Sequence, residues 1–337
     1  MKQHKTFLLG IVASLGFVVL ILDTKTSLLG AKEGIELCLN SVLPTLFPFC
    51  VLTKILNPLL LCKPFPLLRP IGKIFGVPAG SESILLLGFI SGYPIGAQNV
   101  QDAYRNKTIA LQDCRRMLGF CSNAGPAFIF GMLGGLFETT TPLWCLLGIH
   151  IISSALVGCI LPNKSKSIVH IEKAVSINLP KALEESVKTM ACVCGWIIIF
   201  RVILQFFKHW FLWRISITGQ AVFSGILELS QGCVSLYNIS SSGLCYILCA
   251  TVLGFGGICV AMQTASVVKQ TGTGYYFPGK IMQTIISILL ASLTQYILFN
   301  GDDIYIVPIW ILICCITLLA FLIYIVRRKK KVVAIIK

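Results

Sequence analysis

Apolar segments long enough to cross a lipid bilayer recur along this chain from Phe7 to Val326, and they constrain its fold more than any other feature. A transmembrane helix needs about 20 predominantly apolar residues. Eight segments meet or approach that length, at 7–22, 34–56, 118–137, 143–161, 183–207, 243–268, 281–299 and 304–326. Only 12% of the 337 residues are charged, whereas about a quarter are charged in a soluble domain. The sequence therefore predicts an all-α polytopic membrane protein with about eight transmembrane helices.

Two further apolar segments, 81–100 and 215–239, are interrupted at their centres by glycine, proline or polar residues. The first contains SGYPIG at 91–96, and the second contains LELSQG at 227–232. Their uninterrupted apolar cores are about 8 to 12 residues long, which is too short to cross a bilayer. A broken backbone is tolerated in a membrane only where it faces protein or a water-filled cavity. Both segments predict re-entrant hairpins, and a kinked span packed through its glycines is the alternative for the first.

The basic residues favour one orientation of this topology. When both interrupted segments are counted as hairpins, most Lys and Arg residues fall on the same side as the two termini. They are Lys63, Arg69, Lys73, Arg105, Lys107, Arg115, Arg116, Lys164, Lys166, Lys173, Lys181, Lys269 and Lys280, followed by RRKKK at 327–331. The positive-inside rule then predicts a cell-membrane protein with both termini in the cytoplasm. This placement also accounts for the net charge of +15 without a nucleic-acid partner.

The order of the segments repeats along the chain. Residues 33–161 contain a span, the hairpin at 81–100 and two further spans, and residues 183–299 contain a span, the hairpin at 215–239 and two spans. Because each unit crosses three times, the second is inverted relative to the first, as in many secondary transporters. The remaining parts are an N-terminal helix in 1–32, a cytoplasmic linker at 162–182, and a last span with a basic cytoplasmic tail at 300–337.

Four breaks in predicted helices supply the candidate site: SGYPIG, LELSQG, SNAGPAF at 122–128 and GFGGICV at 254–260. Half-helix ends expose backbone N–H and C=O groups that can hold an anion or a carbonyl group. The predicted substrate-binding residues are Ser91, Gly92, Tyr93, Asn123, Gly125, Glu228, Ser230, Gln231, Gly257 and Gln263. For the glycines, close helix packing is the alternative role. An intramembrane carboxylate such as Glu228 is usually a proton site, a cation site or a hydrogen-bond acceptor, unless a shallow hairpin leaves it near the surface.

Three other polar features have simpler interpretations. Arg201 lies well inside a predicted span, where it binds a substrate carboxylate, snorkels toward the membrane surface or pairs with a glutamate. Lys188 follows Glu184 by four residues, the spacing of an ordinary pair on a helix surface. The segment QDAYRNKTIALQDCRR at 101–116 is predicted to be a solvated cytoplasmic loop.

The sequence offers no motif for catalysis or metal binding. Most of the 15 cysteines lie within apolar runs, and the four histidines form no HxxxH or HExxH pattern. Such cysteines are most simply small buried hydrophobic residues. Ser91 has no GxSxG elbow around it. We therefore expect neither an enzyme nor a cofactor or metal site.

Three motifs, PTLFPFCVL, GFISGYPIGA and CSNAGPAFIFG, resemble signatures of the sporulation integral membrane protein family YlbJ (SpoVV). This family is part of the larger group that carries the nucleoside-recognition Gate domain, and the resemblance spans about residues 33–299. It implies a fold similar to concentrative nucleoside transporters, with paired re-entrant hairpins. It also implies a role in moving dipicolinic acid across the outer forespore membrane during sporulation. The chain is short for that subgroup, which leaves room for another substrate.

The sequence and the resemblance together predict a membrane permease for a small organic anion, with dipicolinic acid as the substrate that the family implies. The alternatives are a carrier of nucleosides or other small metabolites, and a membrane scaffold for spore assembly that transports nothing. Few polar residues are available for reading a nucleoside. The expected partners are the substrate and the lipid bilayer, and a homo-oligomer is left open.

Overall fold

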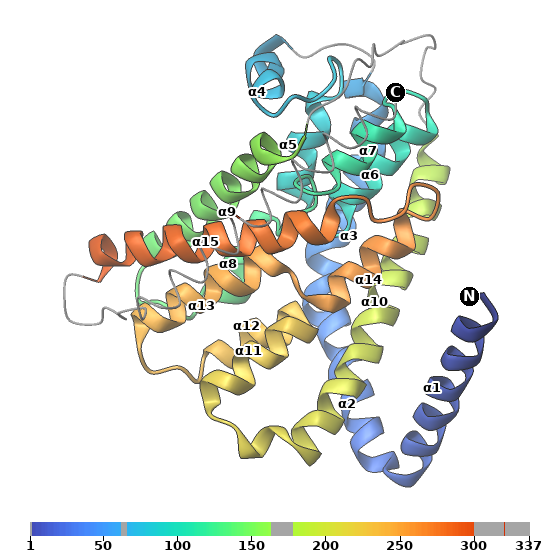
Figure 1. Ribbon diagram of the computed structural model, residues 1–337, viewed down its shortest axis with the longest axis vertical. Coiled ribbons are helices and arrows are strands. Elements are labelled where there is room, and N and C mark those ends of the chain that lie inside the picture. Colours follow the sequence, from blue (N-terminus) through green and yellow to red (C-terminus); the bar gives the residue numbers. More distant parts are fainter. Residues whose placement is uncertain (1, 62–65, 163–177, 300–319, 321–337) are drawn as a thin grey trace.

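The computed structural model describes residues 2–61, 66–162, 178–299 and 320, and every regular element in these ranges is a helix (Figure 1). The α-helices are α1 (Lys2–Leu22), α2 (Thr24–Leu37), α3 (Leu43–Leu61), α4 (Arg69–Ile74), α5 (Glu82–Ser91), α6 (Ile95–Arg105), α7 (Leu111–Met117), α8 (Pro126–Leu133), α9 (Thr141–Ile160), α10 (Leu179–Trp210), α11 (Ile217–Leu227), α12 (Leu229–Leu236), α13 (Ser242–Phe255), α14 (Gly257–Val267) and α15 (Tyr276–Leu298). A π-helical segment, Cys38–Val42, joins α2 to α3, and short 3-10 helices occupy Pro66–Leu68 and Leu212–Arg214. The predicted all-α class is confirmed.

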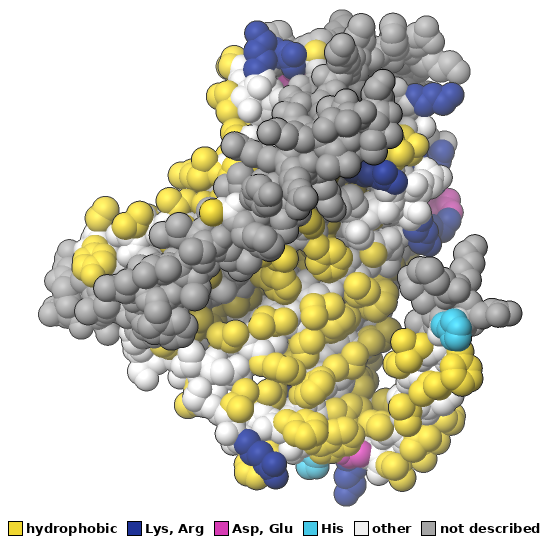
Figure 2. All heavy atoms as spheres, viewed as in Figure 1, with side chains coloured by type: hydrophobic (Ala, Val, Ile, Leu, Met, Phe, Trp, Pro, Cys, Tyr) yellow, Lys and Arg dark blue, Asp and Glu magenta, His cyan; other side chains and the backbone are white. Residues whose placement is uncertain are grey.

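Five helical stretches of the described chain are long and apolar enough to cross a membrane. They are Thr24–Leu60, Thr141–Ile160, Leu179–Trp210, Ser242–Val267 and Tyr276–Leu298, and they match five of the eight predicted spans. Figure 2 shows a broad band of hydrophobic side chains, with Lys and Arg gathered toward the two ends of the molecule. Burial of such a band in lipid is favourable and its exposure to water is not. The chain is therefore an integral membrane protein.

The other three predicted spans have different outcomes. The first coincides with α1, whose apolar part, Thr6–Leu22, is shorter than the five long stretches. The last, at 304–326, lies outside the described residues. The prediction of a continuous span at 118–137 is wrong, because the only helix there is α8, with eight residues. At about 1.5 Å per residue, this helix is far too short to cross a hydrocarbon core of about 30 Å.

The chain before α8 is non-helical because side chains satisfy its backbone. The Phe120 carbonyl accepts hydrogen bonds from Asn123 Nδ2 at 2.7 Å and from Ser154 Oγ at 2.6 Å. Helix α8 then begins at Pro126, in the first turn, where a residue without an N–H is tolerated. The break predicted at Gly125–Pro126 therefore exists, and it shortens the helix far more than the sequence suggested.

The long helices form two groups. The α2–α3 stretch runs antiparallel to α10. Gly30 packs against Val202 and Gly34 packs against Ile198, so residue numbers rise along one helix as they fall along the other. Glycine allows this close approach of two helices. Helices α9, α13 and α15 pack against one another in the second group. In Figure 1 this group lies to the left of α2, α3 and α10.

Two pairs of short helices lie between these groups, and each pair folds back on itself. In the α5–α6 pair, a Cβ atom added to Gly96 would lie 3.2 Å from Gly88 Cα. In the α11–α12 pair, a Cβ atom added to Gly232 would lie 2.4 Å from Gly225 Cα. Glycine thus faces glycine where the helices of each pair meet. We call these pairs hairpin 1 (82–105) and hairpin 2 (217–236).

The segment 101–116 is not the solvated loop that its polarity predicted. It contains the end of α6 and most of α7, and Asp113 is buried. Arg116 is 4% exposed, and its Nη2 atom donates to the carbonyl oxygens of Phe75 and Gly158 at 2.6 and 2.5 Å. Arg116 therefore fastens α7 to α9 and to the chain that follows α4.

Candidate functional site

The four predicted breaks meet at one place in the structure. A Cβ atom added to Gly92, at the turn of hairpin 1, would lie 3.1 Å from the Gly125 nitrogen. Tyr93, in the same turn, donates a hydrogen bond from its hydroxyl group to the Leu253 carbonyl at 3.2 Å. A Cβ atom added to Gly256 would lie 3.1 Å from the Tyr93 hydroxyl oxygen. The turn of hairpin 1 therefore contacts both the start of α8 and the break between α13 and α14.

Hairpin 2 joins the same junction through Gly257. A Cβ atom added there would lie 3.1 Å from the Gly225 oxygen and 3.1 Å from the Leu229 nitrogen. Gly257 and Gly92 also have φ values of +82° and +78°, in the left-handed region that glycine adopts readily. At these two positions, both the close approach and the backbone conformation require glycine.

A cavity of about 250 Å³ opens where these breaks meet. This volume is near the lower end of the range for small-molecule sites, about 300–1,000 Å³. Six of the ten predicted site residues line it, namely Gly92, Tyr93, Gly125, Glu228, Ser230 and Gln263. The cavity is bounded by parts of both hairpins, by α8, α10 and α14, and by the α2–α3 stretch.

The other four predicted residues support the cavity without lining it. The Ser91 hydroxyl is 2.7 Å from that of Thr53 on α3. Gln231 receives a hydrogen bond from Arg201 Nη1. Asn123 bonds to the Phe120 carbonyl, and Gly257 packs against hairpin 2 as described above. The assignment of all ten as substrate-binding residues stays a prediction.

The cavity also has a polar wall that the sequence reasoning did not include. Asn40, Ser41 and Thr45 line it from the π-helical segment and the first turn of α3. A π-helical segment inside an α-helix is often found at functional sites. Its sequence signal is the pair Asn40 and Ser41 between apolar neighbours, within CLNSV.

Glu228 lies at the turn of hairpin 2 and begins α12. Its side chain is buried, and its two oxygens accept the backbone N–H groups of Ser230 at 2.9 Å and Gln231 at 2.7 Å. Arg201 Nε lies 3.6 Å from the same carboxylate, and Arg201 Nη1 lies 4.0 Å from Glu33 Oε2 on α2. Of the three roles predicted for Arg201, the structure therefore shows the glutamate pair. This group of Arg201, Glu228 and Glu33 is called the Arg201 cluster below.

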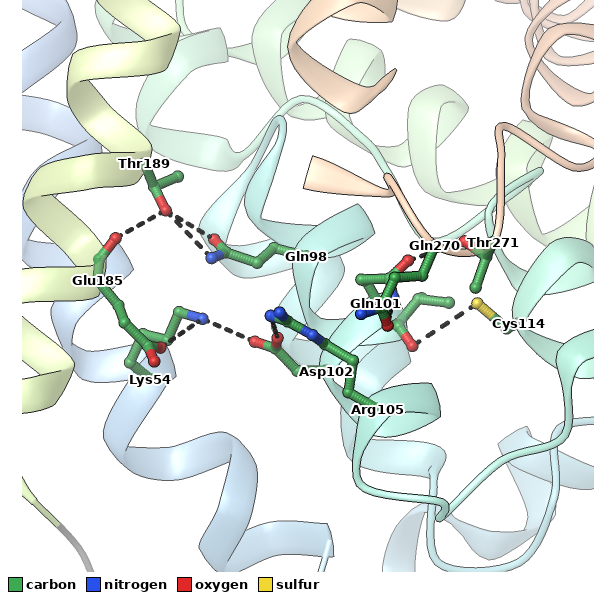
Figure 3. Close-up of polar contacts among 11 residues, drawn as sticks. Lys54, Gln98, Gln101, Asp102, Arg105, Cys114, Glu185, Thr189, Gln270 and Thr271 are labelled. Atoms are coloured by element: carbon green, nitrogen blue, oxygen red, sulfur yellow. Dashed lines mark hydrogen bonds and ion pairs between the residues drawn. The ribbon is translucent and has the colours of Figure 1, made fainter. Parts of the chain in front are cut away.

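A second ion cluster links hairpin 1 to α10 and to α3, which continues the α2–α3 stretch. Lys54 Nζ on α3 lies 2.7 Å from Asp102 on α6 and 3.2 Å from Glu185 on α10. Figure 3 shows Lys54 between these two carboxylates, with the bonded pair Gln98 and Thr189 beside them. We call Lys54, Asp102 and Glu185 the Lys54 cluster.

Each of the two clusters consists of one cation and two carboxylates, and these lie on corresponding parts of the structure. Each has a cation on one long helix, an acid on the adjacent hairpin, and an acid on the opposite long helix. Glu185 and Arg201 are 16 positions apart on α10, which is about 24 Å of helix, and Val193 and Ile197 between them line the cavity. The cavity therefore lies between the clusters along α10. The predicted surface pair is also present, with Lys188 Nζ 2.5 Å from Glu184 Oε1.

We expect the substitution Lys54→Met to destabilise the protein and to loosen hairpin 1. It removes two ion-pair contacts from partly buried carboxylates, a loss of about 1.5–3 kcal/mol when hydrogen bonds to charged groups are broken. The measurements are the melting temperature in detergent and the rate of maleimide labelling at buried Cys50, followed by peptide mass spectrometry. Lys188→Met, which breaks an ion pair exposed to solvent, is the matched control and should change stability little. Equal effects of the two substitutions would contradict this prediction.

Lys280 was predicted as a charge in a cytoplasmic connection, and the structure shows that this is wrong. It lies in α15 and is 1% exposed. Its Nζ atom donates to Gln283 Oε1 at 2.7 Å, to the Tyr93 hydroxyl at 3.1 Å and to Asn123 Oδ1 at 3.4 Å. The sequence signal was the spacing of Lys280 and Gln283, which places both on one face of the helix.

His150 on α9 completes this group of buried polar residues. Its Nε2 atom accepts the Ala124 N–H at 3.0 Å, and Gln283 Nε2 lies 3.4 Å from its Nδ1 atom. Ala124 lines the cavity. Within the described ranges, no three His, Cys, Asp or Glu side chains are close enough together to hold a metal ion.

Comparison with known proteins shows a distant similarity. The sporulation integral membrane protein YlbJ of Bacillus subtilis (strain 168) is 24% identical to it over 315 residues, and the match covers 78% of this chain and 76% of that protein. The chain is a distant relative of YlbJ. The resemblance predicted from the three motifs is therefore confirmed. No family model and no solved structure matches the chain.

The relationship and the geometry support each other. All three motifs lie in the described part of the YlbJ relative, and two of them form the contact between Gly92 and Gly125 at the cavity. The third, PTLFPFCVL at 44–52, begins α3 beside the π-helical segment and includes the cavity residues Thr45 and Leu46. The motifs that carry the family resemblance thus meet at the candidate site.

Proposed function

We propose that this YlbJ relative is a permease for a small organic anion, and that the cavity at the hairpin turns is its substrate site. The observation that carries this proposal is the convergence of four helix breaks on one cavity, whose mostly apolar wall includes a few polar side chains. Binding sites at broken helices are typical of secondary transporters. The family resemblance suggests dipicolinic acid as the substrate and the outer forespore membrane as the location. The distribution of basic residues supports a cytoplasmic position for both termini.

The two ion clusters suggest how such a permease works. Each cluster fastens one hairpin to both long helices, and the cavity lies between them along α10. If the hairpins are re-entrant and belong to inverted repeats, the clusters hold the cavity closed toward opposite sides of the membrane. Opening one cluster at a time gives alternating access without any chemical step. A substrate that binds the two states with different affinities shifts the balance between them.

Uptake by proteoliposomes tests the proposal. We expect purified protein to carry labelled dipicolinate into vesicles, and we expect Gly131→Leu to reduce that uptake at least tenfold. Gly131 lines the cavity, and a Cβ atom added to it meets no atom within 4 Å, so a leucine side chain fills space that the substrate would occupy.

Gly148→Leu is the matched control, because a Cβ atom added there also meets nothing within 4 Å and Gly148 is not part of the cavity wall. Its uptake should equal that of the wild type. Uptake of a nucleoside in place of dipicolinate would support the carrier of other metabolites. If none of the tested solutes is transported under any ion gradient, the result would support the alternative of a membrane scaffold.

A further inference from the structure

Lys280 is a buried cation whose partners are all neutral. Its three hydrogen-bond acceptors are a tyrosine hydroxyl and two side-chain amides. Within the described part of the chain, no carboxylate lies within 4.0 Å of its Nζ atom, whereas Lys54 and Arg201 each contact two. Burial of a charge without a counter-charge is costly. An anion bound close to Lys280 would offset this cost.

Tyr93 connects Lys280 to the cavity. The Tyr93 hydroxyl accepts a hydrogen bond from Lys280 Nζ, and the ammonium group lies 4.9 Å from the centre of the tyrosine ring. The same tyrosine lines the cavity wall. A single side chain therefore separates the unbalanced charge from the proposed substrate, and little solvent is present to screen it.

The charged side chain in the cavity wall already has a partner. Among the described residues, Glu228 is the one carboxylate that lines the cavity, and Arg201 lies beside it at 3.6 Å. Lys280 therefore adds a positive charge next to the cavity that is not part of this ion pair. An anionic solute bound there would be attracted, and a neutral solute of the same shape would gain nothing from this charge.

We propose that Lys280 determines the charge selectivity of the cavity: it attracts the carboxylate of the bound solute through Tyr93, and it makes the site prefer a dicarboxylate over a neutral analogue. This inference rests on the proposed function, since it concerns the same cavity. Lys280 acts here as a selectivity residue behind the cavity wall.

The experiment compares two probes of the same shape on purified full-length protein, dipicolinate and the neutral pyridine-2,6-dicarboxamide, by isothermal titration calorimetry. We expect the wild type to prefer dipicolinate by at least tenfold. In Lys280→Met, the affinity for dipicolinate should fall at least tenfold while the affinity for the diamide changes less than twofold. In Lys280→Arg, which keeps the charge, most of the preference should remain. Lys188→Met is the control for a lost surface charge.

The outcomes separate this inference from the proposed function. Unchanged preference in Lys280→Met, or equal losses for both probes, would overturn the role of Lys280 while leaving the cavity as a binding site. A wild type that binds neither probe would overturn both for this substrate class. If Lys280→Met does not fold, Tyr93→Phe keeps the test open. It removes the hydroxyl between the charge and the cavity, and it should reduce the preference for dipicolinate at least threefold.

Discussion

Arg201→Met is expected to lower the stability of the protein by about 3–5 kcal/mol and to abolish uptake, because it leaves Glu228 buried beside no cation. The Glu228 side chain is 2% exposed, so water cannot replace the guanidinium group. The same substitution removes the hydrogen bond to Gln231 and the contact with Glu33. Hairpin 2 then loses these polar contacts with α10, and α10 loses its ion pair with α2. Thermal unfolding in detergent and proteoliposome uptake measure the two effects.

A double substitution distinguishes the loss of the ion-pair partner of Glu228 from the loss of the packing of the Arg201 side chain. Arg201→Met with Glu228→Gln removes both charges, and the glutamine oxygen can still accept a backbone N–H at the start of α12. We expect it to recover most of the stability, since replacing both members of a buried pair is often nearly neutral. Lys188→Met, on the same helix but with an exposed partner, should leave the melting temperature nearly unchanged. If the double variant is as unstable as Arg201→Met, the charge pair is not the cause.

Sequence reasoning located the helix breaks because glycine, proline and polar residues are rare inside apolar runs and have few interpretations there. Gly92, Gly125 and Glu228 were found in this way, and the structure places all three at one cavity. The contacts between distant segments were not readable. Nothing in the sequence states that Tyr93 and Lys280, 187 positions apart, share a hydrogen bond.

The errors have a common physical cause. Charge counting treats every lysine or arginine outside a long apolar window as a residue of a connection. Lys280 and Arg116 satisfy that rule, yet both are buried, because amide, hydroxyl or carbonyl oxygens from other segments surround them. In the same way, hydropathy joined 118–137 into one span, whereas side chains of Asn123 and Ser154 satisfy its backbone without a helix.

Gly96→Ala is expected to disrupt hairpin 1, although it adds only one methyl group. That carbon would lie 2.1 Å from the Cys121 carbonyl oxygen and 3.2 Å from Gly88 Cα, so backbone atoms on both sides would have to move. Overpacking of this kind costs typically about 1–3 kcal/mol. The displaced helix carries Asp102 of the Lys54 cluster and begins beside the turn at Gly92. We therefore expect uptake to fall by at least tenfold, together with a lower melting temperature.

Gly131→Ala and Gly148→Ala make the same change where a Cβ atom meets nothing within 4 Å. Both lie within helices, where alanine is favoured over glycine by about 0.5–1 kcal/mol, so these variants should melt at the same temperature as the wild type or slightly higher. A Gly96→Ala variant that is as stable as both controls and as active as Gly148→Ala would show that α6 can move away from Cys121 at no cost. The turn of hairpin 1 would then not depend on the contact between α5 and α6, and the position of Tyr93 between Lys280 and the cavity would have to be set by the bond to the Leu253 carbonyl instead.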